Sequence, residues 1–445
     1  MSALARISHA PIHLSPNRRR VGSVALATAL LTPLGVTTPA IASAPQVGSA
    51  SVITDWNRIA VAALLADTSK LVQEDLLYVG FVNAAVYDAV VGIDGRYRPY
   101  LLHARAPRGA SDQAAAVAAA HKVLVTYVPT QREALDADYA ASLAKIPDGH
   151  AETAGIAYGE RAADALIASR VGDGRNAKVT FDKAPAPGVW RPTPPGFLDM
   201  AVPWLGGVKP LLVRSGAQFG EPGPPPALTS RRYTRDFVEV EEFGSKNSTE
   251  RTAEQTTTAL FFSGNPLVQY DTALGDQVTV RQLDIVDAAR MFAVVNMSMA
   301  DALISVWHAK LLYGFWRPIT AIREADTDGN PATVADRDWT PLIPTNTPPY
   351  PDYVSGYSGV TGAFTRALAE TFTTRHLQVS LISTAVPGTT RQYDSGKALR
   401  DDVVSARVWL GIHFRTADVR GVNMGQQVAR YALAHYFQPV KKGHR

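Results

Sequence analysis

Residues 348–359 read PPYPDYVSGYSG, and the apolar residues from Val360 to Phe372 that follow recur at helical spacing. A proline-rich extended segment that runs into a helix predicts Ser355 and Gly356 at or near the helix N-terminus. Free N–H groups and the helix dipole attract an anion there, while Ser355 adds a hydroxyl and Gly356 permits close approach. Taken alone, this stretch is more typical of an ordinary N-cap at Ser355 or Ser358 than of an anion site.

Lys310 and Arg317 flank an apolar stretch in the sequence KLLYGFWR of residues 310–317. At about 100° per residue, their separation turns a helix through nearly two full turns and puts both cations on one face. Two positive charges on a mostly buried helix are costly unless an anion neutralises them. The alternative is that both cations are partly exposed and lay their apolar stems along the surface.

Arg407 and His413 are separated by the apolar residues of the sequence RVWLGIH, residues 407–413. Their separation corresponds to about 240° on an ideal helix, so the two side chains would point in different directions. If both reach one site, the helix must break near Gly411. A single histidine in an apolar stretch is more often a hydrogen-bonded core residue, and only the other two segments favour a functional role.

In chain order, the three segments read Lys-x6-Arg-Pro, Pro-x3-Ser-Gly-x-Ser and Arg-x5-His. This order and spacing resembles that of the vanadium-dependent haloperoxidases and the related type-2 phosphatidic acid phosphatases. Four further stretches resemble landmarks of the bacterial haloperoxidase branch: Thr54–Asn57, Asn83–Ala89, Arg251–Gln255 and Phe315–Pro318. The resemblance covers nearly the whole chain after residue 44, and it implies the helical bundle of that superfamily, with long proline-rich loops.

The resemblance implies a role for each residue of the three segments. His413 would be the axial ligand of vanadium, or the nucleophile that attacks phosphorus in a phosphatase. The equatorial oxygens would be held by Lys310, Arg317, Ser355, Gly356 and Arg407. Arginine suits this task because its planar guanidinium donates two hydrogen bonds at once to an oxyanion. The implied cofactor is vanadate, and phosphate would occupy the same site.

The chain departs from the family pattern at two positions. Tyr357 stands where the family usually has the histidine that acts as acid and base. Ala417 stands where the family often has an aspartate, and Asp418 lies one place later. A phenol with a pKa of about 10 mainly donates a hydrogen bond at neutral pH, whereas an imidazole near about 6.5 both takes and gives a proton. We expect impaired turnover, with Tyr357 either at the reacting oxygens or packed in the pocket wall.

The leading hypothesis is a secreted enzyme resembling the vanadium-dependent haloperoxidases. Its substrates would be hydrogen peroxide, a halide and an organic acceptor, with Lys310 polarising the peroxide and His413 and Tyr357 as further catalytic candidates. The alternative in the same superfamily is a phosphomonoesterase with His413 as nucleophile. A third hypothesis, motivated by Tyr357, is a catalytically silent or repurposed member that binds a phosphate-like ligand.

The composition is that of a globular protein, since 46% of the 445 residues are hydrophobic and 19% are charged. Residues 1–44 contain four arginines and no acidic residue, so the formal net charge of +4 falls to about zero for the remainder. This balance does not favour nucleic acid as a partner. The absence of cysteine excludes disulfides, thiolate metal sites and c-type haem attachment.

Residues 1–44 have the pattern of an export signal. Three arginines at residues 18–20 precede a weakly apolar stretch from Val21 to Val36, and small residues permit cleavage after Ala42 or Ala44. This stretch is short for a membrane span, so we expect no stable membrane anchor. The pattern predicts a secreted or extracytoplasmic protein.

Helical periodicity dominates the rest of the chain, which predicts a single all-α domain over residues 45–445 and leaves homo-oligomer formation open. The irregular proline-rich segment 184–230 retains tryptophans and leucines, so we expect it to pack on the bundle. The predicted helices are Thr54–Ala66, Gln73–Val91, Ser111–Tyr127, Gln131–Ala144, Thr153–Val171, Thr229–Glu242, Thr252–Phe262, Gln282–Tyr313, Ser358–Thr371, Arg391–Trp409 and Ala417–His435.

Overall fold

The computed structural model describes residues 47–345 and 347–440, and the predicted export signal over residues 1–44 lies outside them. The described residues form fourteen α-helices and one β-hairpin within one compact unit, so the predicted all-α class is confirmed. The elements are α1 (Val47–Ala66), α2 (Val72–Asp94), α3 (Asp112–Tyr127), α4 (Arg132–Leu143), α5 (His150–Ser169), α6 (Ala217–Gly220), α7 (Arg231–Gly244), α8 (Ala253–Phe261), α9 (Pro266–Val280), α10 (Ile285–Tyr313), α11 (Pro318–Arg323), α12 (Gly356–Thr371), β1 (His376–Ile382), β2 (Thr390–Ser395), α13 (Gly396–Trp409) and α14 (Arg415–His435).

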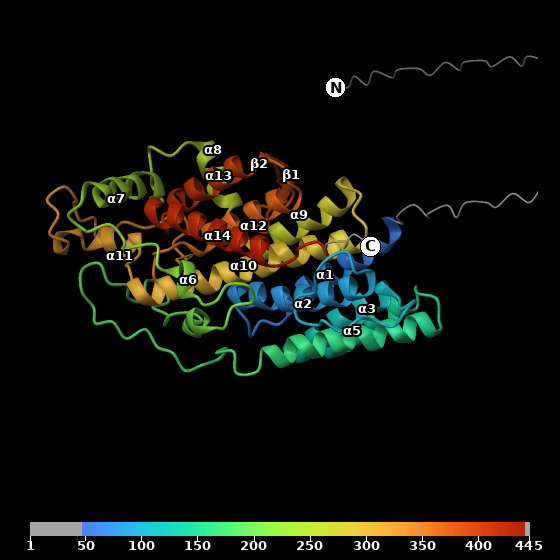
Figure 1. Ribbon diagram of the computed structural model, residues 1–445. Coiled ribbons are helices and arrows are strands. Elements are labelled where there is room, and N and C mark those ends of the chain that lie inside the picture. The colour runs from blue at the N-terminus through green and yellow to red at the C-terminus, as the bar shows by residue number, and fades with distance from the viewer. Residues whose placement is uncertain (1–46, 346, 441–445) are drawn as a thin grey trace, which may run out of the picture. The chain divides into compact units, whose positions relative to one another are not determined.

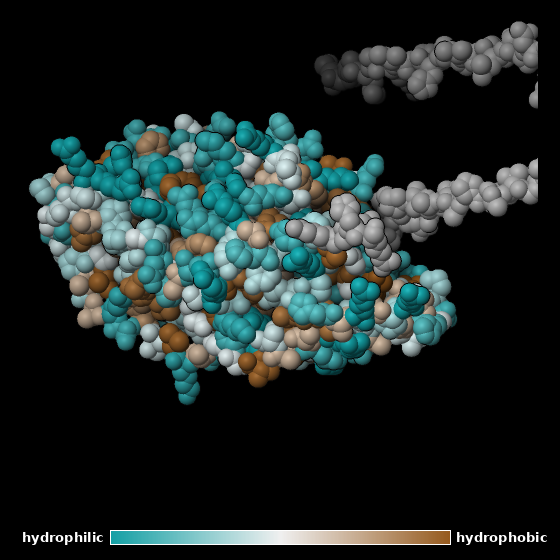
Figure 2. All heavy atoms as spheres, in the orientation of Figure 1, coloured by the Kyte–Doolittle hydropathy of each residue, from teal (hydrophilic) through white to brown (hydrophobic). Residues whose placement is uncertain are grey.

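α10 is the central helix of the bundle. Its first turn is capped by Asp284, whose carboxylate accepts hydrogen bonds from the N–H groups of Val286 and Asp287 at 3.1 and 2.9 Å. It packs against α2, α12 and α14, between the blue N-terminal and red C-terminal helices in Figure 1. Both α2 and α10 are long and apolar enough to cross a membrane, but 89% and 94% of their most apolar windows are buried in the protein, as in core helices. The visible outer face is mostly hydrophilic, with hydrophobic residues scattered over it (Figure 2).

α12 and α14 pack closely because glycines line their contact. A Cβ atom on Gly425 of α14 would lie 1.9 Å from the carbonyl oxygen of Gly359 on α12. A larger residue therefore fits here only if a helix backbone moves, which a close-packed interior resists. This contact fixes the start of α12 against α14, and the N–H of Ser355 donates to the carbonyl of Ala417 in the first turn of α14 at 3.0 Å. The predicted site residues Ser355 and His413 lie next to these two helix starts.

The β-hairpin replaces part of a predicted helix. The helix expected over Arg391–Trp409 begins only at Gly396, because Thr390–Ser395 form β2 and pair antiparallel with β1. Leu377, Val379 and Leu381 of β1 are buried and alternate with more exposed residues, and pairing with this strand decides the conformation of Arg391–Ser395.

The sequence does not predict α9, because its buried face is partly polar. Gln269, Asp271 and Gln277 lie on that face and interrupt the apolar period that identifies a core helix. Asp271 Oδ1 accepts hydrogen bonds from the side-chain amides of Asn57 and Asn296, both at 2.9 Å. Partners on other helices thus compensate the burial of these polar groups.

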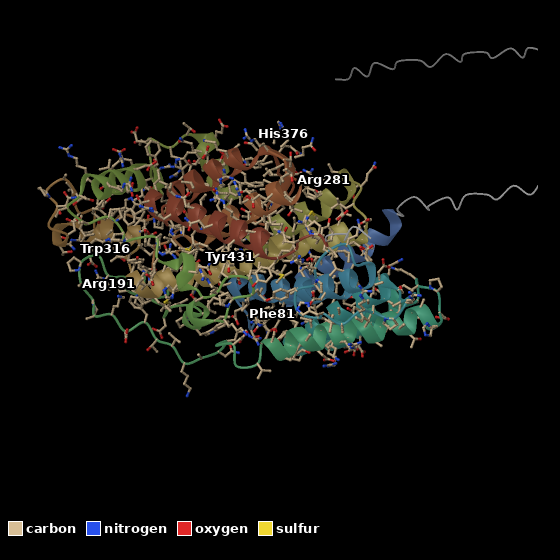
Figure 3. The ribbon with its side chains drawn as sticks, viewed as in Figure 1. Phe81, Arg191, Arg281, Trp316, His376 and Tyr431 are labelled. Carbon is tan, nitrogen blue, oxygen red and sulfur yellow. The ribbon has the colours of Figure 1, made fainter. Side chains whose placement is uncertain are left out.

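The irregular segment 184–230 lies against the end of α10 and the residues that follow it. The backbone N–H of Trp190 donates to the carbonyl of Gly314 at 2.7 Å, and the backbone N–H of Trp316 donates to the carbonyl of Gly188 at 3.0 Å. Figure 3 accordingly shows Arg191 near Trp316. These hydrogen bonds fix the extended backbone between α10 and α11.

Asp301 attaches the same segment to the middle of α10. Its carboxylate is 0% exposed and accepts hydrogen bonds from the N–H groups of Leu211, Leu212 and Val213 at 2.6, 2.6 and 2.8 Å. Burial raises the pKa of Asp301 to about 6, although the three N–H groups oppose the shift. One buried side chain therefore satisfies three loop amides that have lost their water.

We expect Asp301→Ala to lower the free energy of unfolding by about 3 kcal/mol, because three buried N–H groups lose their acceptor. Asp276→Ala, at an exposed position on α9, is the control and should change it by less than about 0.5 kcal/mol. Urea unfolding followed by circular dichroism measures both values. Equal effects of the two substitutions would contradict this role of Asp301.

Candidate active site

Lys310 lies in the last turn of α10 and is 0% exposed. Its Nζ donates hydrogen bonds to the carbonyl oxygens of Pro351 at 2.5 Å and Asp352 at 3.1 Å. Burial and the neighbouring charge of Arg317 lower the pKa of Lys310 well below its ordinary value. The lysine thus binds the proline-rich segment that leads to Ser355, and a nearby anion would favour its charged form.

The prediction that Lys310 and Arg317 share a face of one helix is wrong. α10 ends at Tyr313, because Gly314 takes a left-handed conformation with φ of 59°, and Arg317 follows in an extended segment as the residue before α11. Arg317 is also 0% exposed. The two cations therefore reach one site from a helix end and from the turn that follows it.

Arg317 connects the two other predicted segments. Its Nε donates to the carbonyl of Tyr350 at 2.8 Å, and its Nη1 donates to the carbonyl of Ile412 at 2.7 Å. Its Nη2 is buried and has no hydrogen-bond partner among the described residues. The guanidinium thus connects the loop before Ser355 to the loop around His413, and its Nη2 remains without a partner.

α12 begins at Gly356 with Ser355 as its N-cap residue, as predicted. The ordinary capping role is wrong, however, because the Ser355 side chain makes no capping hydrogen bond. Its buried Oγ has no partner at hydrogen-bond distance among the described residues, although it lies near enough to the Asp418 carboxyl group to lower that group's pKa. A free hydroxyl and the N-terminal N–H groups of a sixteen-residue helix are therefore available to a ligand.

The predicted break between Arg407 and His413 is confirmed. α13 ends at Trp409, and Gly411 has φ of 77°, with a Cβ position only 2.5 Å from the carbonyl oxygen of Gly244. Arg407 Nη1 donates to the carbonyl of Phe262 at 2.8 Å, whereas its buried Nε has no partner in the described part of the chain. The break lets both side chains serve one site.

His413 is 1% exposed and contacts two charged groups. Its Nδ1 lies 2.7 Å from Asp352 Oδ1, and its Nε2 lies 3.2 Å from Arg317 Nη1. Arg317 Nη1 also lies 3.4 Å from Nδ1, so this contact does not select a tautomer. The Asp352 carboxyl group at Nδ1 favours the tautomer that carries its proton on Nδ1 and leaves the lone pair on Nε2. Burial, together with Arg317 and Lys310, lowers the pKa of His413 well below its ordinary value. The imidazole is therefore neutral.

Asp352 is the site residue that the sequence analysis missed. The family pattern directs attention to positions 417 and 418, but Asp418 accepts a hydrogen bond from Ser358 at 2.8 Å instead. Burial raises the pKa of Asp418 to about 7, and it also raises the pKa of Asp352, against the opposing charges of Arg317 and Lys310. The only sequence signal for Asp352 is its place in the segment that leads to Ser355.

Tyr357 packs in the pocket wall, one of the two expected placements. Its hydroxyl donates to Gln269 Oε1, and Gln269 Nε2 in turn donates to a backbone carbonyl at 3.3 Å. Its ring lies against Phe262 and Tyr270, and Arg407 lies 4.8 Å from the ring centroid. Burial raises the pKa of Tyr357 well above its ordinary value, so the phenol stays protonated and is no base. The sequence does not identify Gln269 as a neighbour of Tyr357, because it does not predict α9.

We define the oxyanion cage as Lys310, Arg317, Ser355, Gly356, Arg407 and His413. Three of its buried donor atoms have no partner among the described residues: Arg317 Nη2, Arg407 Nε and Ser355 Oγ. Leaving each such donor unpaired costs about 1–3 kcal/mol, so a ligand rich in acceptors fits. The buried Oδ2 atoms of Asp352 and Asp418 also have no hydrogen-bond partner among the described residues. An oxyanion that carries a hydroxyl group could donate a hydrogen bond to such an acceptor. Vanadate and phosphate both have this chemistry.

Comparison with known proteins relates this geometry to an established fold. Residues 290–442 match the family model described as the VCPO second helical-bundle domain, and this stretch contains the whole oxyanion cage. The vanadium chloroperoxidase of Curvularia inaequalis is 31% identical over an alignment of 141 residues, with coverage of 26% of this chain and 22% of that protein. This relative is thus matched over about a fifth of its length.

Two solved structures resemble most of the chain. The first bacterial vanadium-dependent iodoperoxidase superposes with a TM-score of 0.73 at 23% identity, over 88% of this chain and 97% of that one. The holo-type bacterial vanadium-dependent chloroperoxidase superposes with a TM-score of 0.65 at 17% identity, over 81% and 91%. The chain therefore has the vanadium haloperoxidase fold.

We expect His413 to remain neutral, with its proton on Nδ1, as the pH falls from 8 to 5. Its lowered pKa means that protonation occurs only below the range where an exposed histidine titrates, about pH 6.5. Long-range nitrogen-15 NMR spectra of the imidazoles measure this, and His413→Gln identifies the signal. A resonance that titrates near about pH 6.5 would refute the assignment.

Proposed function

We propose that the oxyanion cage binds vanadate and that the protein oxidises halide with hydrogen peroxide. The proposal is carried by the neutral His413, whose Nε2 lone pair adjoins the unpaired donors of a buried cationic site. The fold and the matched helical-bundle domain support vanadate over other oxyanions. Phosphate, with the same shape, would compete for the site.

In this proposal the residues of the cage have separate tasks. His413 Nε2 would bind the vanadium, and Asp352 would hold the imidazole in the tautomer that leaves Nε2 free. Arg317, Arg407 and Ser355 would donate hydrogen bonds to the vanadate oxygens, while Lys310 would add a positive charge. Bound vanadate would supply a Lewis acid that activates hydrogen peroxide. The net reaction is halide, peroxide and a proton giving hypohalous acid and water.

Tyr357 limits the rate in this proposal. Its hydroxyl donates to Gln269, so it neither takes a proton from peroxide nor gives one to a leaving group. A positioned acid or base typically contributes about 10²–10⁴-fold. We therefore infer a slow enzyme, in which water or the acceptors on Asp352 and Asp418 handle the protons.

The Asp352–His413 contact also favours a second candidate, a phosphomonoesterase. An imidazole oriented by a carboxylate, with Nε2 free of a proton, is a suitable nucleophile towards phosphorus. A catalytically silent or repurposed phosphate-binding member is the third candidate, and the fixed Tyr357 hydroxyl supports it.

We also propose export of the protein through residues 1–44.

Parallel assays on one purified sample separate these candidates. After loading with orthovanadate, we expect peroxide-dependent oxidation of iodide and bromide, and no phosphate release from an aryl phosphate by the vanadate-free protein. His413→Ala should abolish the activity, because the residue that would bind vanadium is lost. Phosphate release without halide oxidation would overturn the proposal. If His413→Ala kept the activity of the original protein, the oxyanion cage would be excluded as the active site.

We expect Tyr357→His to raise halide oxidation by roughly 10²–10⁴-fold, because it restores an acid and base beside the cage. Tyr357→Phe is the matched control, since it keeps the ring and removes only the hydroxyl bonded to Gln269. Its activity should stay within about threefold of the original. A large loss in Tyr357→Phe would mean that the hydroxyl takes part in the reaction.

A further inference from the structure

One side of α14 lines four pockets on the surface of the protein. The residues on this side are partly or fully exposed and recur every three or four positions, so they share one face of the helix: Arg415, Val419, Asn423, Gln426 and Arg430. Each of them lines at least one of the four pockets, whose volumes are about 630, 460, 210 and 370 Å³. The outer face of one helix thus runs past all four.

The four pockets are continuous, because neighbouring ones share lining residues. The first and second share Lys397 and Arg400, the second and third share Arg415, and the third and fourth share Arg420. We define the α14 groove as these four pockets together. Arg415 and Arg430 lie about 22 Å apart along the helix, so the groove suits a ligand much longer than a single oxyanion.

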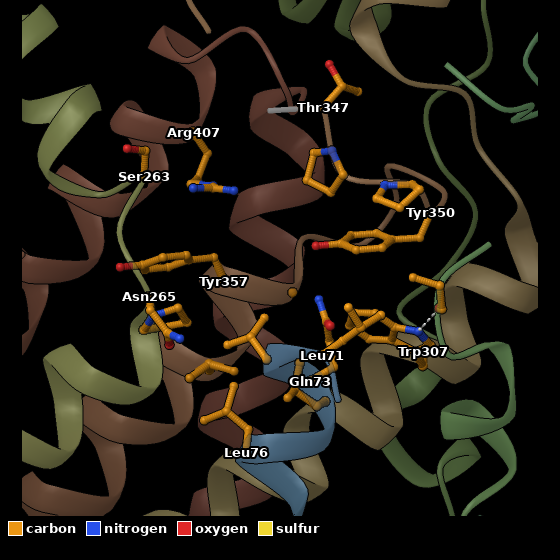
Figure 4. A pocket seen from close by; sticks show the side chains of 18 of the residues that line it. Leu71, Gln73, Leu76, Ser263, Asn265, Trp307, Thr347, Tyr350, Tyr357 and Arg407 are labelled. Carbon is orange, nitrogen blue, oxygen red and sulfur yellow. Dashed lines mark hydrogen bonds between the residues drawn. The ribbon is translucent and has the colours of Figure 1, made fainter. Parts of the chain in front are cut away.

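The α14 groove lies apart from the candidate active site. A pocket of about 470 Å³ borders the oxyanion cage, and Figure 4 shows Tyr357 and Arg407 in its lining. None of the residues that line this pocket also lines the α14 groove. In Figure 1 α13 and α14 lie on the face turned to the viewer, and Figure 2 shows that the surface over them is mostly hydrophilic.

Cations outnumber carboxylates in the lining of the α14 groove. Eight arginines and one lysine line it, against the four carboxylates of Glu221, Asp236, Glu370 and Asp401. Residues 45–445 as a whole carry a formal net charge of about zero, so positive charge is concentrated on this surface. A surface with such an excess of one sign attracts a ligand of the opposite sign.

Most of these cations have no charged partner. Three of them form salt bridges: Arg366 with Glu370, Lys397 with Asp401, and Arg415 with Glu239. The other six form no salt bridge among the described residues: Arg232, Arg235, Arg375, Arg400, Arg420 and Arg430. Arginine donates two parallel hydrogen bonds to a carboxylate or a sulfate ester, so these guanidiniums are available to an anionic ligand.

Arg400 and Arg366 are the cations most in need of an anion. Arg400 is partly buried, and its Nη1 donates to Thr365 Oγ1 at 3.0 Å. Burial lowers the pKa of Arg400, and the nearby charge of Arg366 lowers it further, although Asp401 opposes the shift. Arg366 Nε is itself buried and has no hydrogen-bond partner in the described part of the chain. An anion bound next to both guanidiniums would offset their desolvation and their repulsion.

The uncharged lining distinguishes between the classes of acidic polymer. Gln218, Asn423, Gln426 and Gln427 supply amides that donate and accept hydrogen bonds, as sugar hydroxyls require. Phe219 is the one aromatic residue in the described lining, whereas unpaired nucleic-acid bases stack on aromatic rings and protein partners are commonly anchored by them. A groove also admits a linear chain, while a flat lipid surface contacts only its edges.

We propose that the α14 groove binds a linear acidic polysaccharide. Its sulfate esters or carboxylates would pair with the arginines that have no salt bridge, and its hydroxyl groups would bond to the amides. Such binding would hold the protein on a polymer and leave the oxyanion cage free, because the cage and the groove share no residue.

Titration of the vanadate-free protein with heparin, a sulfated polysaccharide, and with polygalacturonate, a carboxylated one, tests the inference. We expect saturable binding of at least one of them and none of dextran, a neutral polysaccharide. The tighter ligand identifies the anionic group that the groove recognises. Binding should weaken roughly tenfold when the salt concentration rises from about 50 to about 200 mM, because the contacts are between exposed charges.

A triple variant with Arg375→Gln, Arg420→Gln and Arg430→Gln should bind roughly tenfold more weakly, because three ion pairs with the ligand are lost. The matched control carries Arg58→Gln, Arg105→Gln and Arg108→Gln, three exposed arginines outside the groove, and removes the same total charge. Its affinity should change by less than about twofold. Thermal unfolding verifies that both variants are folded, and the absence of vanadate makes the result independent of the proposed function.

Three results would overturn the inference. The first is a lack of saturable binding of both acidic polysaccharides, and the second is an equal loss of affinity in the two triple variants. The third is tighter binding of single-stranded oligothymidylate, or of vesicles made from equal parts of phosphatidylcholine and phosphatidylglycerol, since the groove would then serve another class of partner.

Discussion

The structure depends on the cost of burying three like charges in one place. Lys310, Arg317 and Arg407 have lost nearly all contact with water, and each compensates part of that loss by donating to backbone carbonyls. Those carbonyls belong to loops distant in sequence, so the cations determine the paths of the loops as well as the charge of the site. The donors left unpaired are the reason to expect an anionic ligand.

The sequence predicts the parts of this arrangement that depend on local geometry. The start of α12 at Ser355 and the break near Gly411 follow from proline, glycine and helical phase, and both are found. The predicted helix Gln282–Tyr313 ends where α10 ends, whereas the predicted shared helical face of Lys310 and Arg317 is wrong, because hydrogen bonds from segment 184–230 hold the backbone beyond Gly314 in an extended path. Asp352 escapes prediction because its partnership with His413 exists only in three dimensions.

Tyr357 connects the cage with the neighbouring pocket. Where the family resemblance predicts a proton-transferring imidazole, this chain has a ring that covers Arg407 and borders an apolar space. The Tyr357 hydroxyl donates its hydrogen bond to Gln269 on α9. Tyrosine in place of the family's histidine therefore removes an acid–base group and adds an aromatic surface. Tyr357 would therefore slow turnover, because it transfers no proton, while its ring would contribute to the selection of a ligand.

Crystallography of the protein soaked with tungstate, a tetrahedral oxyanion with strong anomalous scattering, tests the central claim most directly. The account predicts one tungstate within hydrogen-bonding distance of Arg317 Nη2, Arg407 Nε and Ser355 Oγ, next to His413 Nε2. A cage that stays empty while tungstate occupies only surface arginines would contradict it.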